Sequence, residues 1–285
     1  MPALAKDKTL VLSPSSKWIV NYGDSSCRMM RSFGKGEDEV YALFNRYGPG
    51  DSFQLTVAGK PLNRITSGPM TDFDTQIQFG PNEGAQDVSG QKGTFSEKPA
   101  LIFGSHISVE NRPEEPKYKF GEMEDRPPTT PISPQRLAAI KWVAIGKENG
   151  KRVQLETGAM EKPFAALSAC VDNLVTSWGI DPVKDKNLVK RPQPLSDPGQ
   201  WIRSGDYPSG MVFARQPALV QVRLNVDAGG KVTACHIQET TKPKEFDQAV
   251  CGSLTKRASF SPAIDADGKP AASYWQRTIK FIMPG

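Results

Sequence analysis

The strongest constraint on the fold of this chain is a two-residue alternation near its C-terminal end. The apolar positions are Val220, Val222, Leu224 and Val226, and the polar positions between them are Gln221, Arg223 and Asn225. Because successive side chains of a β-strand point to opposite faces, this segment predicts a strand with one buried face and one polar face. The residues that follow, Asp227-Ala228-Gly229-Gly230, supply flexible backbone for a hairpin into a second strand over residues 231–239.

A helix and a last strand complete this C-terminal unit. The helix is predicted after Pro243 from the apolar spacing of Phe246, Ala249, Val250 and Leu254. A turn over residues 265–268 leads to a strand over residues 274–282, in which Trp275, Arg277, Ile279 and Phe281 share one face. The order strand, strand, helix, strand predicts an antiparallel sheet with the helix packed on one side.

The first half of the chain has the pattern of short strands separated by turns. The predicted strands cover residues 18–22, 27–33, 39–45, 52–58, 74–79 and 99–109. Glycine and proline are abundant, with 25 and 24 residues, which favours turns over long helices. This spacing predicts a β-sandwich or a strongly curved sheet.

Two helices are predicted between the strand-rich part and the C-terminal unit. Ser133-Pro134 is a typical helix start, so a short helix is expected through Ile140, followed by strands over 141–145 and 152–156. Residues 163–178 carry one apolar stripe from Phe164 to Trp178, and Gly179 suits the end of that helix. Residues 111–134 are expected to be irregular.

The predicted fold class is therefore α+β. An N-terminal β-rich, sandwich-like domain with a packed helix (residues 1–180) precedes a small β-β-α-β domain (residues 201–285). Residues 181–200 contain Pro182, Pro192, Pro194 and Pro198 and are predicted to be a linker.

Composition excludes some classes of function. Hydrophobic residues make up 38% and charged residues 24%, as in water-exposed globular domains. The net charge of +5 is spread along the chain, which does not favour nucleic-acid binding. No stretch reaches the roughly 18 apolar residues of a membrane helix. The first residues lack the apolar run of a secretory signal, and Met1 before a short polar lead looks like a start added to a mature chain.

Five pieces of sequence, in order, resemble the TonB C-terminal domain. They are Asp206-Tyr207-Pro208, then residues 220–227 with Gly230-Lys231-Val232, then Phe246-Asp247-Gln248-Ala249, then the segment from Ala258 to Ala263, then Gly268-Lys269-Pro270. The resemblance covers residues 201–285, and the form with Cys235 and Cys251 is most similar to TonB-like proteins of sphingomonad-type bacteria. It implies a small α/β domain of the Gram-negative envelope that binds other proteins.

The chain departs from the TonB family in two respects. Ser209-Gly210 follows Tyr207-Pro208 where the family has an alanine-rich helical turn. The membrane anchor and the Lys-Pro and Glu-Pro spacer of the energy transducers do not occur in this sequence. The N-terminal half resembles the periplasmic β-rich domains of the invasion-associated locus B type, from Trp18-Ile19-Val20, Cys27 and a Leu155-x-Thr-Gly segment, and no residue role is carried over.

The four cysteines, Cys27, Cys170, Cys235 and Cys251, allow three disulfide pairings. If each bond closes within one domain, the pairs are Cys27–Cys170 and Cys235–Cys251, and the second pair ties a strand to the covering helix. Composition alone allows four reduced thiols in a cytosolic protein equally well. The TonB resemblance implies the oxidised form in the periplasm, on the interpretation that a signal or anchor has been removed.

Motifs of catalysis and metal binding are missing from this sequence, which favours a protein that is not an enzyme and has no cofactor. His236 follows Cys235, but neighbours on a strand point to opposite faces and are not expected to share a proton. His106 is expected on the surface rather than as a ligand. The acidic residues Glu114, Glu115, Glu122, Glu124 and Asp125 lack the spacing of a calcium loop.

The last strand suggests where a partner binds. An exposed sheet edge accepts an extended peptide, which would place Tyr274, Gln276, Thr278 and Lys280 beside the partner strand. The alternative is that this strand is only core and solvent face. The predicted function is a non-enzymatic periplasmic module that binds an envelope protein or an extended peptide. Two alternatives remain open, an enzyme with its site in the N-terminal domain and a purely structural envelope protein.

Overall fold

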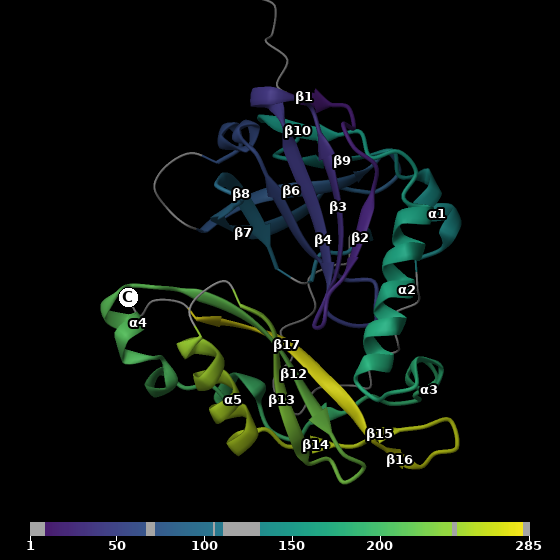
Figure 1. Ribbon diagram of the computed structural model, residues 1–285, viewed down its shortest axis with the longest axis vertical. Coiled ribbons are helices and arrows are strands. Elements are labelled where there is room, and N and C mark those ends of the chain that lie inside the picture. The colour runs from purple at the N-terminus through teal and green to yellow at the C-terminus, as the bar shows by residue number, and fades with distance from the viewer. Residues whose placement is uncertain (1–8, 67–71, 105, 111–131, 241–243, 282–285) are drawn as a thin grey trace, which may run out of the picture. The chain divides into compact units, whose positions relative to one another are not determined.

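The computed structural model describes residues 9–66, 72–104, 106–110, 132–240 and 244–281 (Figure 1). It confirms the α+β class, with 25% of the residues in helices and 41% in strands. Contacts within the chain define two compact units. Of the described residues, the second contains the short segment Asp24–Ser26 and the chain from Asp172 onward, and the first contains the others.

The first unit is built on one sheet of ten strands. Its strands are β1 (Thr9–Leu12), β2 (Ile19–Tyr22), β3 (Cys27–Phe33), β4 (Val40–Arg46), β5 (Gln54–Ala58), β6 (Asp72–Gly80), β7 (Gln86–Phe95), β8 (Lys98–Phe103), β9 (Trp142–Ile145) and β10 (Arg152–Leu155). Its helices are α1 (Pro134–Ala139) and the first part of α2 (Glu161–Ser177), with the 3-10 turns η1 (Gly36–Asp38) and η2 (Lys60–Arg64). The strand order is β1-β10-β9-β6-β7-β8-β5-β4-β3-β2.

The sheet of the first unit is strongly curved. The chain just after β1, at one end of the strand order, forms a bridge to β3 near the other end, between Pro14 and Phe33. The amide of Ser15 donates to the carbonyl of Ser32 at 2.9 Å, which extends this contact. Of the two layouts that the strand pattern allows, the curved sheet is therefore the one present.

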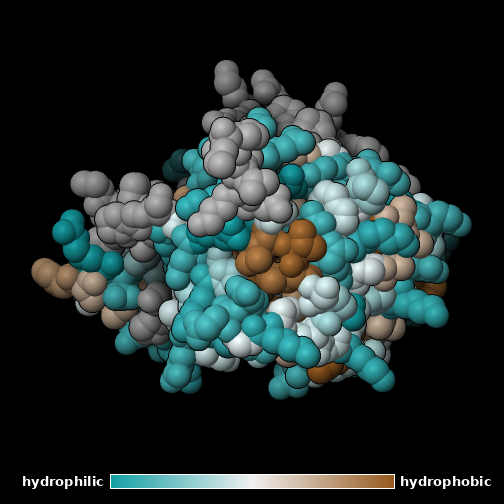
Figure 2. All heavy atoms as spheres, turned by 90° about the horizontal axis from the view of Figure 1, so that it is seen from above, coloured by the Kyte–Doolittle hydropathy of each residue, from teal (hydrophilic) through white to brown (hydrophobic). Residues whose placement is uncertain are grey.

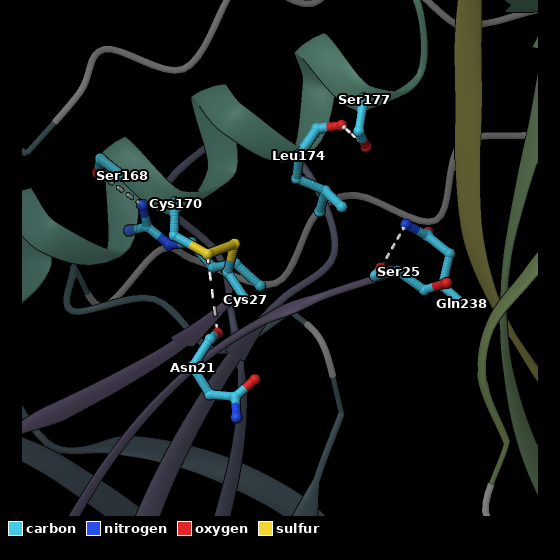
Figure 3. Close-up of a disulfide and its surroundings, with 9 residues drawn as sticks. Asn21, Ser25, Cys27, Ser168, Cys170, Leu174, Ser177 and Gln238 are labelled. Atoms are coloured by element: carbon cyan, nitrogen blue, oxygen red, sulfur yellow. Dashed lines mark hydrogen bonds between the residues drawn. A yellow bond between two sulfur atoms is a disulfide. The ribbon is translucent and has the colours of Figure 1, made fainter. Parts of the chain in front are cut away.

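Helix α2 packs its apolar stripe on aromatic side chains of this sheet. The ring of Phe164 lies 5.9 Å from that of Phe44 and 5.7 Å from that of Phe53, and all three side chains are buried. The sulfur of Cys170, on the same helix, is bonded to Cys27 at the start of β3 (Figure 3). The disulfide therefore joins two elements that are 143 residues apart in the sequence.

The second unit contains a sheet of three strands in the order β13-β12-β17. Its strands and helices are α3 (Pro182–Lys186), β11 (Gln193–Pro194), η3 (Pro198–Gln200), η4 (Ser204–Asp206), α4 (Ser209–Phe213), β12 (Ala218–Val226), β13 (Val232–Thr240), α5 (Glu245–Arg257), β14 (Phe260–Ser261), β15 (Ala263–Ile264), β16 (Pro270–Ala271) and β17 (Ser273–Phe281). Both neighbours of β12 run antiparallel to it.

The apolar face of this sheet is covered by α5. Val220, Val222 and Leu224 of β12 are fully buried in one cluster with Val250 and Leu254 of the helix. Burying each such side chain contributes about 1.5–3 kcal/mol. The β12–β13 turn depends on Gly230, whose φ of +83° favours glycine. A Cβ at Gly230 would collide with the carbonyl of Phe260, so glycine is also needed sterically.

The sulfur atoms of Cys235 and Cys251 lie at bonding distance, with their Cα atoms 5.6 Å apart. This disulfide ties β13 to α5. The two bonded pairs are therefore the pairs expected from the sequence if each disulfide closes within one domain.

Other differences from the sequence-based predictions are local. Strands β1 and β7 were not predicted, and β7 has a polar, glycine-containing sequence in which few side chains are buried. A short helix, α4, follows Tyr207-Pro208 even though Ser209-Gly210 stands where the TonB family has an alanine-rich helical turn. Residues 181–200 were predicted as a linker, and they carry α3 and β11 of the second unit. The division at these residues stays a prediction.

The surface carries few large apolar side chains. Among the described residues, the most exposed one is Phe213 at 89%, and the others above half exposure are Val11, Ile19, Tyr22, Val183, Val189 and Leu195. The face seen in Figure 2 is mostly polar, with a compact apolar group near its middle and smaller apolar spots towards its rim. Isolated apolar residues of this kind are usual on protein surfaces.

The Cys235–Cys251 bond is expected to stabilise the second unit because it restricts the conformations of the denatured chain. Replacing both residues by alanine removes a cross-link across 16 residues, and the free energy of unfolding should fall by about 3 kcal/mol. Urea denaturation of the two proteins measures this difference. Mass spectrometry of the unreduced, alkylated protein provides the control, because four alkylated thiols would contradict both disulfides.

A second prediction concerns the ion pair between η4 and the end of α5. Arg257 donates two hydrogen bonds to Asp206, at 2.5 and 3.1 Å, and lowers the pKa of that carboxyl to about 2. Because the folded pKa lies below the unfolded one, near 3.9, the contribution to stability is complete above that value and disappears as the pH falls towards 2. Asp206→Asn should therefore reduce the melting temperature at neutral pH, and the difference from the parent protein should vanish in this acidic range. A difference that persisted at pH 2 would contradict this assignment.

Candidate functional site

The polar face of the C-terminal sheet lies opposite α5 and carries a hydrogen-bonded network. Gln276 on β17 donates to the side chain of Gln238 on β13 at 2.7 Å, and Thr278 on β17 donates to Gln221 on β12 at 2.6 Å. Gln221 and Gln238 are both buried, at 7% and 8% exposure. Buried amide groups are costly unless they are hydrogen-bonded, so these pairs hold the three strands in register on this face.

At one end of the polar face lies a cluster of Asp185, Arg191 and Tyr274. Arg191 donates two hydrogen bonds of 2.9 Å to the carboxylate of Asp185, and the hydroxyl of Tyr274 donates to the same carboxylate at 3.2 Å. Burial alone would lower the pKa of Arg191, but Asp185 outweighs it and the pKa is raised. Burial raises the pKa of Tyr274, so its hydroxyl remains a donor at neutral pH. This cluster attaches α3 and the following residues to β17.

Next to this cluster, Trp178 joins Tyr274 to Arg223. The rings of Trp178 and Tyr274 meet edge to face at 5.0 Å, and the guanidinium of Arg223 lies 4.2 Å from the centre of the indole ring. Arg223 is on the central strand and is 5% exposed. Burial lowers its pKa to about 10, so the side chain stays positively charged at neutral pH.

A cavity of about 420 Å³ opens beside Arg223 and Trp178. Its lining also includes Ser177, His236 and Gln238 together with Asp24, all of which belong to the second unit. Burial and then the charge of Arg223 lower the pKa of His236, so its ring is neutral at neutral pH. The amide of Gln238 donates to the carbonyl of Ser25 at 3.0 Å, which fixes that part of the wall (Figure 3).

The four residues predicted at the partner edge are found along β17, which is an edge strand of its sheet. Tyr274 is buried in the Asp185 cluster, whereas Gln276 and Thr278 reach across the sheet to Gln238 and Gln221. Lys280 is opposite Leu219 in the register of β17 and β12. These side chains therefore serve the polar face of the sheet, and what β17 offers at the edge is its backbone.

The residues considered for catalysis are not brought together. Cys235 is bonded to Cys251 on the helix side of the sheet, whereas His236 is aligned with Arg223 on the polar side. His106 is exposed in the first unit. Within the described parts of the chain, no three acidic, histidine or cysteine residues group as metal ligands. The acidic residues Glu114, Glu115, Glu122, Glu124 and Asp125 lie outside the described residues.

Sequence reasoning did not find the cluster around Asp185 or the cavity beside Arg223. Arg223 was predicted only as a polar position of a strand, and Asp185 and Arg191 fall in the segment predicted as a linker. Only one signal was available in the sequence, an arginine in the middle of a strand whose neighbours are apolar.

Residues 205–283 match the family model of the Gram-negative bacterial TonB protein C-terminal region. This segment is TonB C-terminal-like, and domains of this family mediate protein–protein interactions in the Gram-negative envelope and are generally not enzymes. No curated protein matches the chain. None of the described helices is long and apolar enough to cross a membrane.

The residues that carry the match have structural roles here. The ring of Tyr207 packs edge to face on Phe246 and Phe281, at 5.6 and 5.3 Å. Its hydroxyl donates to the carbonyl of Gln216 at 2.6 Å. The side chain of Asp227 accepts from the amides of Gly229 and Lys231, both at 2.9 Å, in the turn that Gly230 closes. These residues of the matched segment therefore support its core packing and the turn between β12 and β13.

The Asp185 cluster should be a main support of the polar face. Asp185→Asn leaves Arg191 without its counter-ion and should lower the free energy of unfolding by about 2 kcal/mol. Tyr274→Phe should cost about 1 kcal/mol, because the hydroxyl loses its hydrogen bond to Asp185 and a longer one from Arg191, at 3.4 Å. Chemical denaturation measures both. Asp267→Asn, the same substitution at an exposed turn residue, is the matched control, and a loss as large as that of Asp185→Asn would contradict this role.

Proposed function

We propose that this chain is a non-enzymatic periplasmic module of the Gram-negative envelope, which binds a protein or an extended peptide through its TonB C-terminal-like domain. The observation that carries the proposal is the family match over residues 205–283, together with the position of β17 at the edge of its sheet. An edge strand presents a row of backbone donors and acceptors on its outer side, to which a partner strand can add.

Two further observations support the periplasmic location. All four cysteines are in disulfides within the structure. Disulfides of this kind persist in oxidising compartments such as the bacterial periplasm and are rare in the cytosol. The family itself is associated with the Gram-negative envelope.

The partner is proposed to lie along β17, beside Tyr274, Gln276, Thr278 and Lys280. Because three of these side chains bond within the unit, most of the affinity in this proposal comes from backbone pairing. Specificity then depends on the exposed side chains at alternate positions, such as Arg277.

Affinity capture from Gram-negative envelope extract tests the proposal. The full chain should retain a partner that a chain lacking residues 201–285 does not retain, and mass spectrometry identifies it. In the complex, backbone amides of β17 should exchange hydrogen for deuterium more slowly than in the free protein, because the added strand protects them.

Two results would contradict the proposal. If the truncated chain kept the same partner, the first unit would be the binding site. If protection appeared on β13 while β17 was unchanged, the partner would use the other edge of the sheet. The Asp267→Asn protein is a suitable control for the capture, because the substitution lies in an exposed turn away from β17.

A further inference from the structure

The central observation is a buried positive charge without a carboxylate partner. Arg223 donates one hydrogen bond, to the neutral side chain of Asn225 at 2.6 Å. Its Nε is buried and has no hydrogen-bond partner, and no carboxylate of the described residues lies within ion-pair distance of the guanidinium. Trp178 covers one side of the guanidinium, and this stacking offsets only part of the cost of burial.

The cavity gives this charge access to a ligand. Its volume of about 420 Å³ is within the range of sites for small molecules, and its lining is predominantly polar. Arg223 is buried against the cavity, whereas His236 and Asp24 are exposed at its opening. A ligand that entered past His236 would therefore meet the guanidinium at the inner end.

We propose that this cavity binds a carboxylate, held by the guanidinium of Arg223 with the ring of His236 as a second donor. A guanidinium presents parallel N–H groups that match the two oxygens of a carboxylate. An anion at this place would supply the counter-ion that the buried charge lacks.

The charge balance of the cavity favours a monoanion over phosphate. Its lining contains one arginine, one histidine that is neutral at neutral pH, and the carboxylate of Asp24. A dianion would meet the repulsion of Asp24 with only one full positive charge to balance it. A carboxylate is matched one to one by Arg223.

The cavity lining contains no residue of β17, the strand proposed for the partner, although Gln238 of the lining accepts from Gln276 and Trp178 packs on Tyr274. The cavity is formed on the β13 side of the sheet, by His236 and Gln238 with Arg223 of the central strand. β17 forms the opposite edge. Binding of a carboxylate and binding along β17 can therefore be tested independently, and either can fail without the other.

The histidine rings provide the readout. The chain has two histidines, so two pairs of ring signals are expected in a proton–carbon NMR spectrum, and a His106→Gln protein assigns them. Sodium acetate is added to the full chain at constant pH and ionic strength, with sodium chloride as the balance. The signals of His236 should shift along a saturating curve, while those of His106 should not move.

The matched variants are Arg223→Gln and Arg277→Gln. Both remove one positive charge from the same sheet, but Arg277 is exposed on β17, away from the cavity. Arg223→Gln should weaken acetate binding roughly tenfold or more, because a charged hydrogen-bonded pair is lost. Arg277→Gln should change it by less than about twofold. Arg223→Lys keeps the positive charge but lacks the parallel N–H groups of a guanidinium. It should bind acetate weakly but saturably, provided that its near-ultraviolet circular dichroism shows a native fold.

Asp24→Asn distinguishes a ligand site from an internal pair. If Asp24 is only a neighbour of the site, removing its charge should tighten acetate binding. If Asp24 is the counter-ion of Arg223 in solution, the parent protein would not bind acetate and Asp24→Asn would lower the melting temperature, and this pair of results would overturn the proposal.

A further comparison shows whether the carboxylate comes from a small molecule or from a polypeptide. A blocked Gly-Glu-Gly peptide is compared with its glutamine form. Saturation by acetate and by the glutamate peptide alike indicates a site for any small carboxylate, whereas saturation by the peptide alone indicates an acidic side chain of a polypeptide. A linear, unsaturable shift with both, or tighter binding of phosphate than of acetate, would overturn the proposal.

Discussion

The C-terminal unit depends on the central position of β12. Because this strand pairs with β13 on one side and β17 on the other, its two faces determine what every neighbouring element can contact. On one face, five apolar side chains of β12 are almost completely buried in the cluster that includes α5 and Trp201. On the other face, Gln221 and Arg223 are also buried, although both are polar. The strand is therefore covered on both faces, and the buried polar groups of Gln221 and Arg223 need hydrogen-bond partners.

These partners come from two sources, the neighbouring strands and the residues that follow α2. Side-chain amides and a hydroxyl on β13 and β17 pair with one another and with Gln221, so most of the polar groups have hydrogen bonds within the sheet. Asp185 and Arg191 pair with each other and with Tyr274. A polar network of this kind stabilises a unique arrangement only when its members are satisfied. Arg223 differs, because its guanidinium is next to Trp178 and the cavity and pairs with no carboxylate in the part of the chain that the structure describes.

The sequence predicted what depends on local pattern, and it could not predict what depends on distant segments. The strands β12, β13 and β17 and the helices α2 and α5 were predicted, because their apolar spacing is regular over many residues. Strand β7 was missed because Gln86–Phe95 has glycines and polar residues where strands usually alternate. Asp185 was missed for a different reason. Its partners, Arg191 and Tyr274, are 6 and 89 residues away, and proline content alone describes a linker equally well.

The Cys235–Cys251 bond also explains why a histidine faces the cavity. The bond requires Cys235 to point towards α5, and the period of a strand then directs His236 to the opposite face. Arg223 occupies the same face because Leu224, its neighbour, is aligned with Cys235 and buried with the helix. Side chains alternate between the two faces along β13, so the alternation that directs Cys235 into the core also directs His236 to the other face, beside Arg223. A slip of one residue in this register would exchange the two faces and remove the core and the cavity together.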